Sequence, residues 1–224
     1  MLKARLGAEM KIEVMLADGH PVVRCGLRRM IEGTHDLVVG AETGNGNAAL
    51  ELLRARAWGL AVLDLWIPGR SGLELVKLIR HELPRLPILV FSAQSEEHYA
   101  LRAIRAGACG YLAKDADPET ILSAMRSIAA GGVHFTQEVA ALLSTDASRR
   151  ADAPLHTLLT DREYGVFDRI VRGHALTEIA DDLSLSIKTV STHKSHILDK
   201  LNLHGHVDLV RYAIEHKLLD PTLE

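Results

Sequence analysis

The sequence has little of what disulfide-stapled or membrane-spanning proteins require. Its two cysteines, Cys25 and Cys109, are too few for a disulfide framework, so we expect free thiols that pack among small and apolar residues. A reducing cytoplasm is the expected location. No apolar run approaches the roughly 20 residues that cross a bilayer, and Met1–Met10 lacks the apolar stretch of a secretory signal. Met10 is a plausible alternative start, which would make residues 1–9 an extension or an artefact.

An excess of basic charge is also missing. The formal net charge is −3, so the chain as a whole is not a basic nucleic-acid binder. This does not exclude DNA binding, because affinity depends on the few cations that meet phosphates. The sequence also has no glycine-rich phosphate loop and no nucleophile elbow, which leaves a flavodoxin-like enzyme as a remote alternative.

The first part of the chain alternates short apolar runs with amphipathic stretches. The runs are Ile12–Ala17, Leu37–Ala41, Leu60–Leu65, Pro87–Phe91 and Gly110–Ala113. The stretches between and after them are Val22–Ile31, Asn47–Arg56, Gly72–Leu83, Glu96–Ala106 and Pro118–Ala129. Runs this short and this rich in Val, Ile and Leu are typical of buried parallel strands. Residues 10–130 are therefore predicted to form an α/β doubly wound sheet of five parallel strands, with helices on both faces.

The remainder of the chain is predicted to be a linker and a small all-α domain. Residues 131–154 hold a possible short helix, Thr136–Leu143, and a polar stretch, Ser144–Pro154. The helical domain is assigned to residues 155–224. Its first helix opens with a capping box, Thr160 with Glu163, and runs to about Arg172. The next three are expected at Ala175–Asp182, Ile187–Leu201 and His206–His216.

Four polar residues follow predicted strands where these end at one edge of the sheet. They are Asp18, Asp64, Ser92 and Lys114. Any one alone is best explained as an ordinary polar strand end, but all four at corresponding ends indicate a site. A carboxylate can attack phosphorus, an ammonium can neutralise phosphoryl oxygens, and a divalent cation can bridge acids and phosphate.

This region resembles the receiver domains of two-component response regulators of the NarL/FixJ type, over residues 11–130. The resemblance is carried by Leu16-Ala17-Asp18-Gly19-His20-Pro21, Leu63-Asp64-Leu65-Trp66-Ile67-Pro68-Gly69, Phe91-Ser92-Ala93 and Gly110-Tyr111-Leu112-Ala113-Lys114-Asp115. It implies that Asp64 is the phospho-acceptor, that Ser92 and Lys114 contact the new phosphoryl group, and that Tyr111 is a switch aromatic turning inward when Ser92 moves.

The resemblance also implies a magnesium site and a protein partner. The metal ligands would be Asp18, Asp64 and the backbone carbonyl of Trp66. A sensor histidine kinase would donate the phosphoryl group, and dimerisation would change on phosphorylation.

One residue departs from the receiver pattern. The family usually has two adjacent acids after the first strand, and this chain has Asp18-Gly19. Losing a carboxylate should weaken magnesium binding. Either Asp18, Asp64 and the Trp66 carbonyl still hold the ion, or the receiver is degenerate and acts without phosphoryl transfer.

Trp66 lies two residues past the acceptor and has two interpretations. Its ring could shield an acyl phosphate from water, which predicts slow loss of the phosphoryl group. It could equally do no more than cover apolar surface.

The third helix of the last domain has one apolar stripe and one polar face. The stripe is Val190, Ile197, Leu198 and Leu201. The opposite face is Lys188, Ser191, Thr192, Ser195 and Asp199. A cation followed by small hydroxyl residues suits a helix in the DNA major groove. Taken alone, this face could equally be a solvated surface.

Residues 155–218 resemble the LuxR-type helix-turn-helix domains. The motifs are Leu159-Thr160-Asp161-Arg162-Glu163, Glu178-Ile179-Ala180, Leu183-Ser184-Leu185-Ser186 and Lys188-Thr189-Val190-Ser191-Thr192-His193. By this resemblance the base-reading residues are Ser191, Thr192 and Ser195. The backbone contacts are Lys188, Thr189, His193 and Lys200.

The helical domain departs from the family in its charge. The reading positions are uncharged, Gly205-His206 replaces a frequent serine–arginine pair, and eleven Asp and Glu outnumber eight Lys and Arg in residues 155–224. We therefore expect modest affinity and dependence on a homodimer. The seven histidines of this segment lack metal-ligand spacing.

Together these features predict a transcription regulator that responds to phosphorylation and binds repeated half-sites in promoter DNA as a dimer, not a metabolic enzyme. One alternative is a pseudo-receiver regulator controlled by partners or a ligand, which Gly19 favours. Another is a protein that signals through protein contacts alone, which the acidic helical domain favours weakly.

Overall fold

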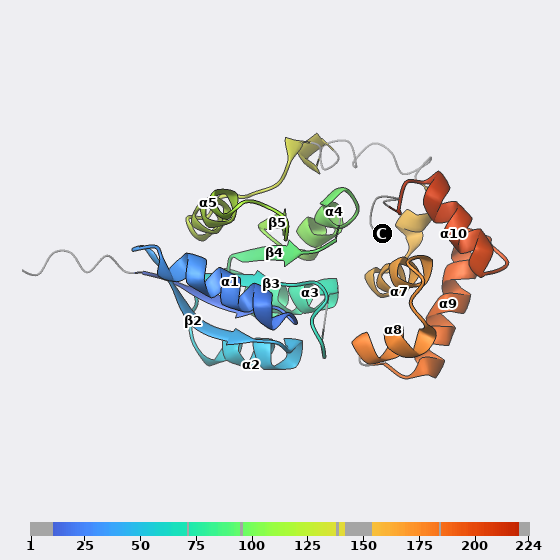
Figure 1. The fold of residues 1–224 in the computed structure, drawn as a ribbon, viewed down its shortest axis with the longest axis horizontal. Helices are drawn as coiled ribbons and strands as arrows, with labels where there is room; N and C mark the ends of the chain where they lie inside the picture. The colour runs from blue at the N-terminus through green and yellow to red at the C-terminus, as the bar shows by residue number, and fades with distance from the viewer. Residues whose placement is uncertain are drawn as a thin grey trace, which may run out of the picture.

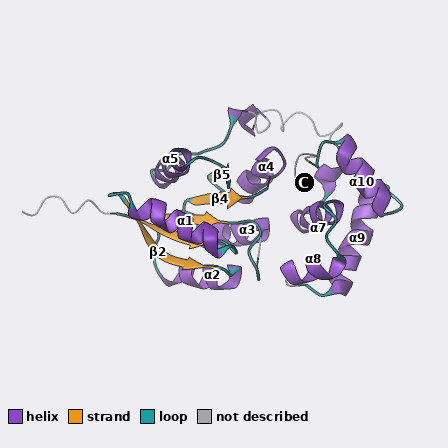
Figure 2. Ribbon diagram, viewed as in Figure 1, coloured by secondary structure: helices purple, strands orange, loops and turns teal. Residues whose placement is uncertain are grey.

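A computed structural model of the chain describes residues 11–70, 72–94, 96–137, 139–141, 154–183 and 185–219. The expected extension at residues 1–9 and the polar stretch 144–153 lie outside these ranges. None of the described helices combines the length and the apolar character that crossing a bilayer requires. The described chain forms a sheet domain followed by a helical domain (Figures 1 and 2).

The sheet domain is the predicted doubly wound fold. Its strands are β1 (Ile12–Ala17), β2 (Leu37–Thr43), β3 (Leu60–Leu63), β4 (Ile88–Ser92) and β5 (Gly110–Ala113). They pair in parallel in the order β2-β1-β3-β4-β5. The helices are α1 (Pro21–Glu32), α2 (Gly46–Ala55), α3 (Gly72–Glu82), α4 (Glu96–Ala106) and α5 (Pro118–Ala129).

Alternation along the strands divides the core between the two faces of the sheet. Val14 and Leu16 of β1 pack in one cluster with residues of α1 and α5. Met15 and Ala17 pack in the other cluster, against α2, α3 and α4. Successive side chains of a strand point to opposite faces, so one short apolar strand supplies both layers.

Several sequence-based details differ from the structure. β3 ends at Leu63 rather than Leu65: Asp64 N–H still donates to Ala17 O at 2.8 Å, and the chain leaves the sheet after this bond. Cys109 packs against the core as expected. Cys25 is exposed, so the expectation that it packs is wrong. It lies two positions before buried Leu27, and this spacing places it on the outer side of α1.

The helical domain contains the four expected helices. They are α7 (Asp161–Val171), α8 (Leu176–Asp182), α9 (Ile187–Leu201) and α10 (His206–Glu215), preceded by an unanticipated 3₁₀ turn, Leu155–Leu158. The capping box is present: Thr160 Oγ1 accepts from Glu163 N, and Glu163 Oε2 accepts from Thr160 N at 2.7 Å. Of the expected helix Thr136–Leu143, residues 137 and 139–141 are described and helical.

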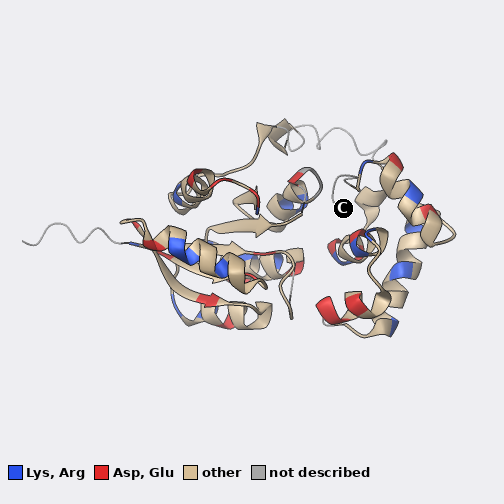
Figure 3. Ribbon diagram, in the orientation of Figure 1, with Lys and Arg blue, Asp and Glu red and all other residues tan. Residues whose placement is uncertain are grey.

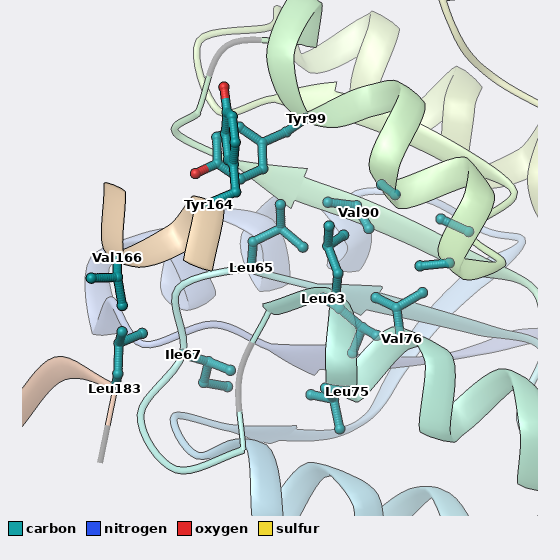
Figure 4. Packing of buried hydrophobic residues seen from close by; sticks show 14 of the residues in the cluster. Leu63, Leu65, Ile67, Leu75, Val76, Val90, Tyr99, Tyr164, Val166 and Leu183 are labelled. Atoms are coloured by element: carbon teal, nitrogen blue, oxygen red, sulfur yellow. The ribbon is translucent and has the colours of Figure 1, made fainter. Parts of the chain in front are cut away.

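One apolar cluster continues from the sheet domain into the helical domain. Tyr99 of α4 meets Tyr164 of α7 edge to face, with ring centroids 5.2 Å apart, and Figure 4 shows the pair beside Leu65. The guanidinium of Arg102 lies 4.0 Å from the centroid of the Tyr164 ring and donates to the carbonyls of His156 and Leu159. Aromatic and cation–π contacts of this kind therefore hold α4 against α7.

The loop after β3 makes a second contact between the domains. The guanidinium carbon of Arg169, on α7, lies 3.4 Å from the centroid of the Trp66 ring. Arg169 is 3% exposed, and Asp182 Oδ2 lies 3.5 Å from its Nε. The loop that follows Asp64 is therefore joined to the first long helix of the other domain.

This contact can be measured in solution, because Trp66 is one of only two tryptophans. In a Trp58→Phe background, Arg169→Ala should shift Trp66 emission to longer wavelength and increase its quenching by acrylamide. Removing the guanidinium opens one face of the ring to water. Arg172→Ala is the matched control, since Arg172 caps the C-terminus of the same helix and pairs with Asp168. Equal spectra for the Arg169 variant and its parent would mean that the domains are apart in solution.

Candidate phosphoryl-acceptor site and DNA-binding face

Asp18 and Asp64 are brought together by the pairing of β1 with β3. Ala17 is registered opposite Leu63, so the next residue of each strand lies at the same carboxyl edge. Both aspartates are 3% exposed. The sequence-based expectation of two acids at one edge therefore describes the geometry correctly.

Lys114 joins the two carboxylates from the end of β5. Its Nζ lies 2.7 Å from Asp18 Oδ2 and 2.8 Å from Asp64 Oδ2. Lys114 N–H donates to Ser92 O, which holds the start of this loop against the end of β4. Burial raises the pKa of Asp64, and the Lys114 ammonium opposes that rise.

Ser92 and Tyr111 are linked through Gln94. Ser92 Oγ accepts from Gln94 N at 3.3 Å, and Tyr111 Oη donates to Gln94 O at 2.9 Å. The Tyr111 side chain is fully buried, so the aromatic that the resemblance singles out lies inward here. Burial raises the pKa of the Tyr111 hydroxyl, which therefore remains a donor.

The backbone after Asp64 faces both the acid and the position of Gly19. Asp64 Oδ1 accepts from Trp66 N at 3.1 Å. A Cβ atom placed on Gly19 would lie 3.4 Å from the Trp66 carbonyl oxygen and 3.1 Å from Pro68 Cδ. A side chain at residue 19 would thus begin beside the Trp66 carbonyl. Two carboxylates near a backbone carbonyl are oxygen donors that suit a divalent cation.

Two residues near the site carried no predicted role. The Nδ1 atom of His20 lies 3.1 Å from Asp18 Oδ1 and 3.7 Å from Asp64 Oδ2. Asp18, His20 and Asp64 form a group whose donor atoms all lie within 4.8 Å of one another. The sequence signal for His20 was its place two residues after Asp18. Arg169 had no such signal, because its contact with Trp66 joins two domains.

α9 presents a polar strip on its outer side. Lys188, Ser191, Thr192 and Ser195 are all exposed. Thr192 Oγ1 donates to Lys188 O and Ser195 Oγ donates to Ser191 O, so both hydroxyls keep acceptor capacity. Ser186 caps the helix by accepting from Thr189 N at 3.0 Å, and Thr189 is partly buried beside that cap.

Two of the predicted DNA contacts lie off this strip. Lys200 Nζ is 2.7 Å from Glu163 Oε2, the carboxylate of the capping box on α7. His193 is partly buried with a buried Nδ1, and burial lowers its pKa. The structure therefore groups Lys188 with the three base-reading candidates and directs Lys200 and His193 toward the domain's own interior.

Charge is unevenly spread around the strip. Figure 3 shows basic residues along α9, all of them lysines (Lys188, Lys194 and Lys200), whereas the end of α8 is acidic at Asp181 and Asp182. These acids stand shortly before the start of α9 in the chain. Part of the excess of acidic residues that the sequence shows for this domain thus lies close to the polar strip.

Comparisons with known proteins agree with both domains. The family model described as "Response regulator receiver domain" matches residues 14–126, and that described as "Bacterial regulatory proteins, luxR family" matches residues 157–213. The response regulator UvrY of Escherichia coli O157:H7 is 33% identical over 209 residues, covering 92% of this chain and 95% of that protein. The transcriptional activator protein ExaE of Pseudomonas putida is 37% identical over 210 residues, covering 92% and 97%.

Solved structures give the same result. RcsB from Salmonella enterica serovar Typhimurium, bound to promoter P1flhDC in the presence of the phosphomimetic BeF3−, is similar with a TM-score of 0.64 and 25% identity, covering 90% of this chain and 98% of that chain. Another RcsB structure from Salmonella typhimurium, described in terms of conformational dynamism for DNA interaction, reaches a TM-score of 0.68 at 27% identity, covering 92% and 98%. The chain belongs to the NarL/FixJ-type response regulators, which join a receiver domain to a LuxR-type helix-turn-helix domain.

Proposed function

We propose that this chain is a transcription regulator that accepts a phosphoryl group on Asp64 from a sensor histidine kinase and binds promoter DNA through α9. The observation that carries the proposal is the buried Asp64 carboxylate, whose Oδ2 lies 2.8 Å from Lys114 Nζ beside Asp18. The relatives' names support the regulatory role: ExaE is a transcriptional activator, and RcsB has been solved on promoter DNA.

Each residue of the edge has a part in the transfer. An Asp64 oxygen forms a bond to phosphorus while the bond from phosphorus to the donor breaks, and the leaving group keeps the electron pair. Lys114 neutralises charge on the phosphoryl oxygens, and the Ser92 hydroxyl donates a hydrogen bond to one of them. Bound magnesium would supply further neutralisation, held by Asp18, Asp64 and the Trp66 carbonyl.

Phosphorylation has a direct route to the helical domain. Asp64 Oδ1 accepts from the N–H of Trp66, and the Trp66 ring lies against Arg169 on α7. A phosphoryl group on Asp64 changes how well its carboxylate oxygens accept hydrogen bonds. The Trp66 N–H, and the backbone of residue 66 with it, must then adjust. The adjustment loosens or re-forms the ring contact, and with it the docking of α7.

The first prediction concerns the acceptor. Incubation with acetyl phosphate and either Mg²⁺ or Mn²⁺ should add the mass of one phosphoryl group to the wild type and none to Asp64→Ala, as read by intact-mass spectrometry. Asp36→Ala should behave as wild type, because Asp36 pairs with Arg126 away from the site. No gain in any protein with either ion, or with a cognate kinase, would favour the pseudo-receiver alternative that Gly19 suggests.

A second prediction concerns the stability of the phosphorylated form. Trp66→Ala should shorten its lifetime severalfold, since the ring two residues past Asp64 limits the approach of water to the acyl phosphate. Trp58→Phe should leave the lifetime unchanged, because Trp58 lies against Arg56 of the same domain. The decay of the intact phosphoprotein mass measures both. If the phosphorylated Trp66→Ala variant decays at the wild-type rate, the ring does not shield the acyl phosphate, and its role is limited to the contact with Arg169.

A third prediction concerns the polar strip. On duplexes that the protein selects from a random library, Lys188→Gln should reduce the slope of log affinity against log salt by about 0.9, because one phosphate contact is lost. Lys217→Gln is the charge-matched control, since Lys217 is exposed after the end of α10. Equal slopes for both variants would show that Lys188 makes no phosphate contact, which would contradict a DNA interface on this face of α9. Failure to select any duplex would favour signalling through protein contacts alone.

Dimerisation fits the weak charge of the strip. Lys188 is the strip's one cation, so a single domain gains little from phosphate contacts. Two domains on repeated half-sites add their contacts without any new residue. A homodimer is therefore the expected DNA-binding form.

A further inference from the structure

The position of His20 is set by the start of α1. His20 is the N-cap residue, followed by Pro21 at the first helical position, and its backbone N–H donates to Asp18 Oδ1 at 2.8 Å. The same backbone turn brings the imidazole Nδ1 to 3.1 Å from that oxygen. The Nδ1 side of the ring therefore faces the two buried carboxylates, although the side chain as a whole is 64% exposed.

The distances around Nδ1 suit a shared cation. Nδ1 lies 3.1 Å from Asp18 Oδ1 and 3.7 Å from Asp64 Oδ2. Neighbouring donor atoms around an ion at 2.0–2.2 Å stand about 2.8–3.6 Å apart in octahedral or tetrahedral arrangements. Small movements of an exposed ring are enough to bring all three atoms to one ion.

A cation already lies beside these three groups. Lys114 Nζ is 3.3 Å from His20 Nδ1 and within 2.8 Å of both carboxylates. Asp18 Oδ2 is buried and accepts no hydrogen bond of ordinary geometry in the described chain, so this ion pair is its close polar contact. The site is thus built around positive charge, and a metal ion bound to Asp18 Oδ2 would share that oxygen with the Lys114 ammonium.

Gly19 leaves the donor set short of one oxygen. The family's usual second acid is absent, and a side chain at residue 19 would begin 3.4 Å from the Trp66 carbonyl. Two carboxylates and a neutral imidazole carry one negative charge less than three carboxylates. Magnesium strongly prefers oxygen donors and Mn²⁺ is also well served by them, whereas imidazole suits borderline ions such as Fe²⁺, Ni²⁺ and Zn²⁺.

We propose that His20 is a ligand of the divalent-cation site in place of the missing acid, and that it shifts the site from magnesium toward borderline transition-metal ions. The inference rests on the proposed function in one respect: the carboxylates that would hold the metal, Asp18 and Asp64, are also those that serve phosphoryl transfer. Metal binding is measured on the unphosphorylated protein, so its failure and the failure of phosphorylation are separate results.

The test uses the full chain and Mn²⁺ as the probe. Mn²⁺ bound to the wild type should show nitrogen modulation in pulsed electron paramagnetic resonance, and His20→Ala should lose it. His35→Ala should keep it, because exposed His35 precedes β2 at the opposite edge of the sheet. Absence of nitrogen modulation in the wild type, or its persistence in His20→Ala, would overturn the proposal.

Selectivity supplies an independent readout. Titrations followed by Trp66 emission in the Trp58→Phe background should show that His20→Ala lowers Zn²⁺ affinity about tenfold and Mg²⁺ affinity less than about threefold. Gly19→Asp should reduce the preference for Zn²⁺ over Mg²⁺ by restoring an oxygen donor, with the Pro68 ring yielding a few tenths of an ångström. Equal losses for both ions in His20→Ala would reduce His20 to a structural residue and overturn the proposal.

Discussion

The receiver domain depends on one ammonium group held between two buried carboxylates. Asp18 and Asp64 are each 3% exposed, and like charges at this depth repel strongly and lose most of their hydration. Lys114 is the residue that compensates both, at 2.7 and 2.8 Å. The arrangement exists because β1, β3 and β5 end at the same edge and the chain turns directly after each. A phosphoryl group or a divalent ion that enters the site must therefore replace or rearrange the ion pairs that Lys114 already makes with the two carboxylates.

Much of this site could be predicted because it follows from strand periodicity. Short apolar runs give buried parallel strands, parallel strands end together, and Asp64 and Lys114 follow two such ends. The ends of a helix could also be predicted where a capping motif marks them, as Thr160 and Glu163 mark the start of α7. Contacts that depend on side-chain direction or on two domains meeting had no comparable signal. Arg169 against Trp66 and Lys200 against Glu163 belong to this class, and nothing in the sequence indicates either contact.

Lys200 illustrates how a cation can contribute to the stability of the domain itself. Glu163 is 4% exposed, and its Oε2 accepts from Thr160 and lies 2.7 Å from Lys200 Nζ. Because an unpaired carboxylate at that depth would be costly, the lysine is needed there and joins α9 to the start of α7. The polar strip is left with Lys188 and hydroxyl groups, and acids at the end of α8 stand nearby. Weak attraction by each single domain follows from this division, so DNA binding must depend on how two domains are placed together.

Trp66 connects the phosphoryl-acceptor site to one of the contacts between the domains, because three of its groups face different parts of the molecule. Its N–H donates to Asp64 Oδ1, its carbonyl lies beside Gly19, and its ring packs against Arg169. Because the three groups belong to one residue, a displacement of Trp66 that follows a change at Asp64 Oδ1 would also displace its carbonyl and its ring. Gly19 makes this coupling tighter: without a side chain there, the Trp66 carbonyl is one of few oxygens left for a cation. If the glycine at residue 19 weakens the metal site, cation binding would depend more on the Trp66 carbonyl and therefore on the contact between the domains.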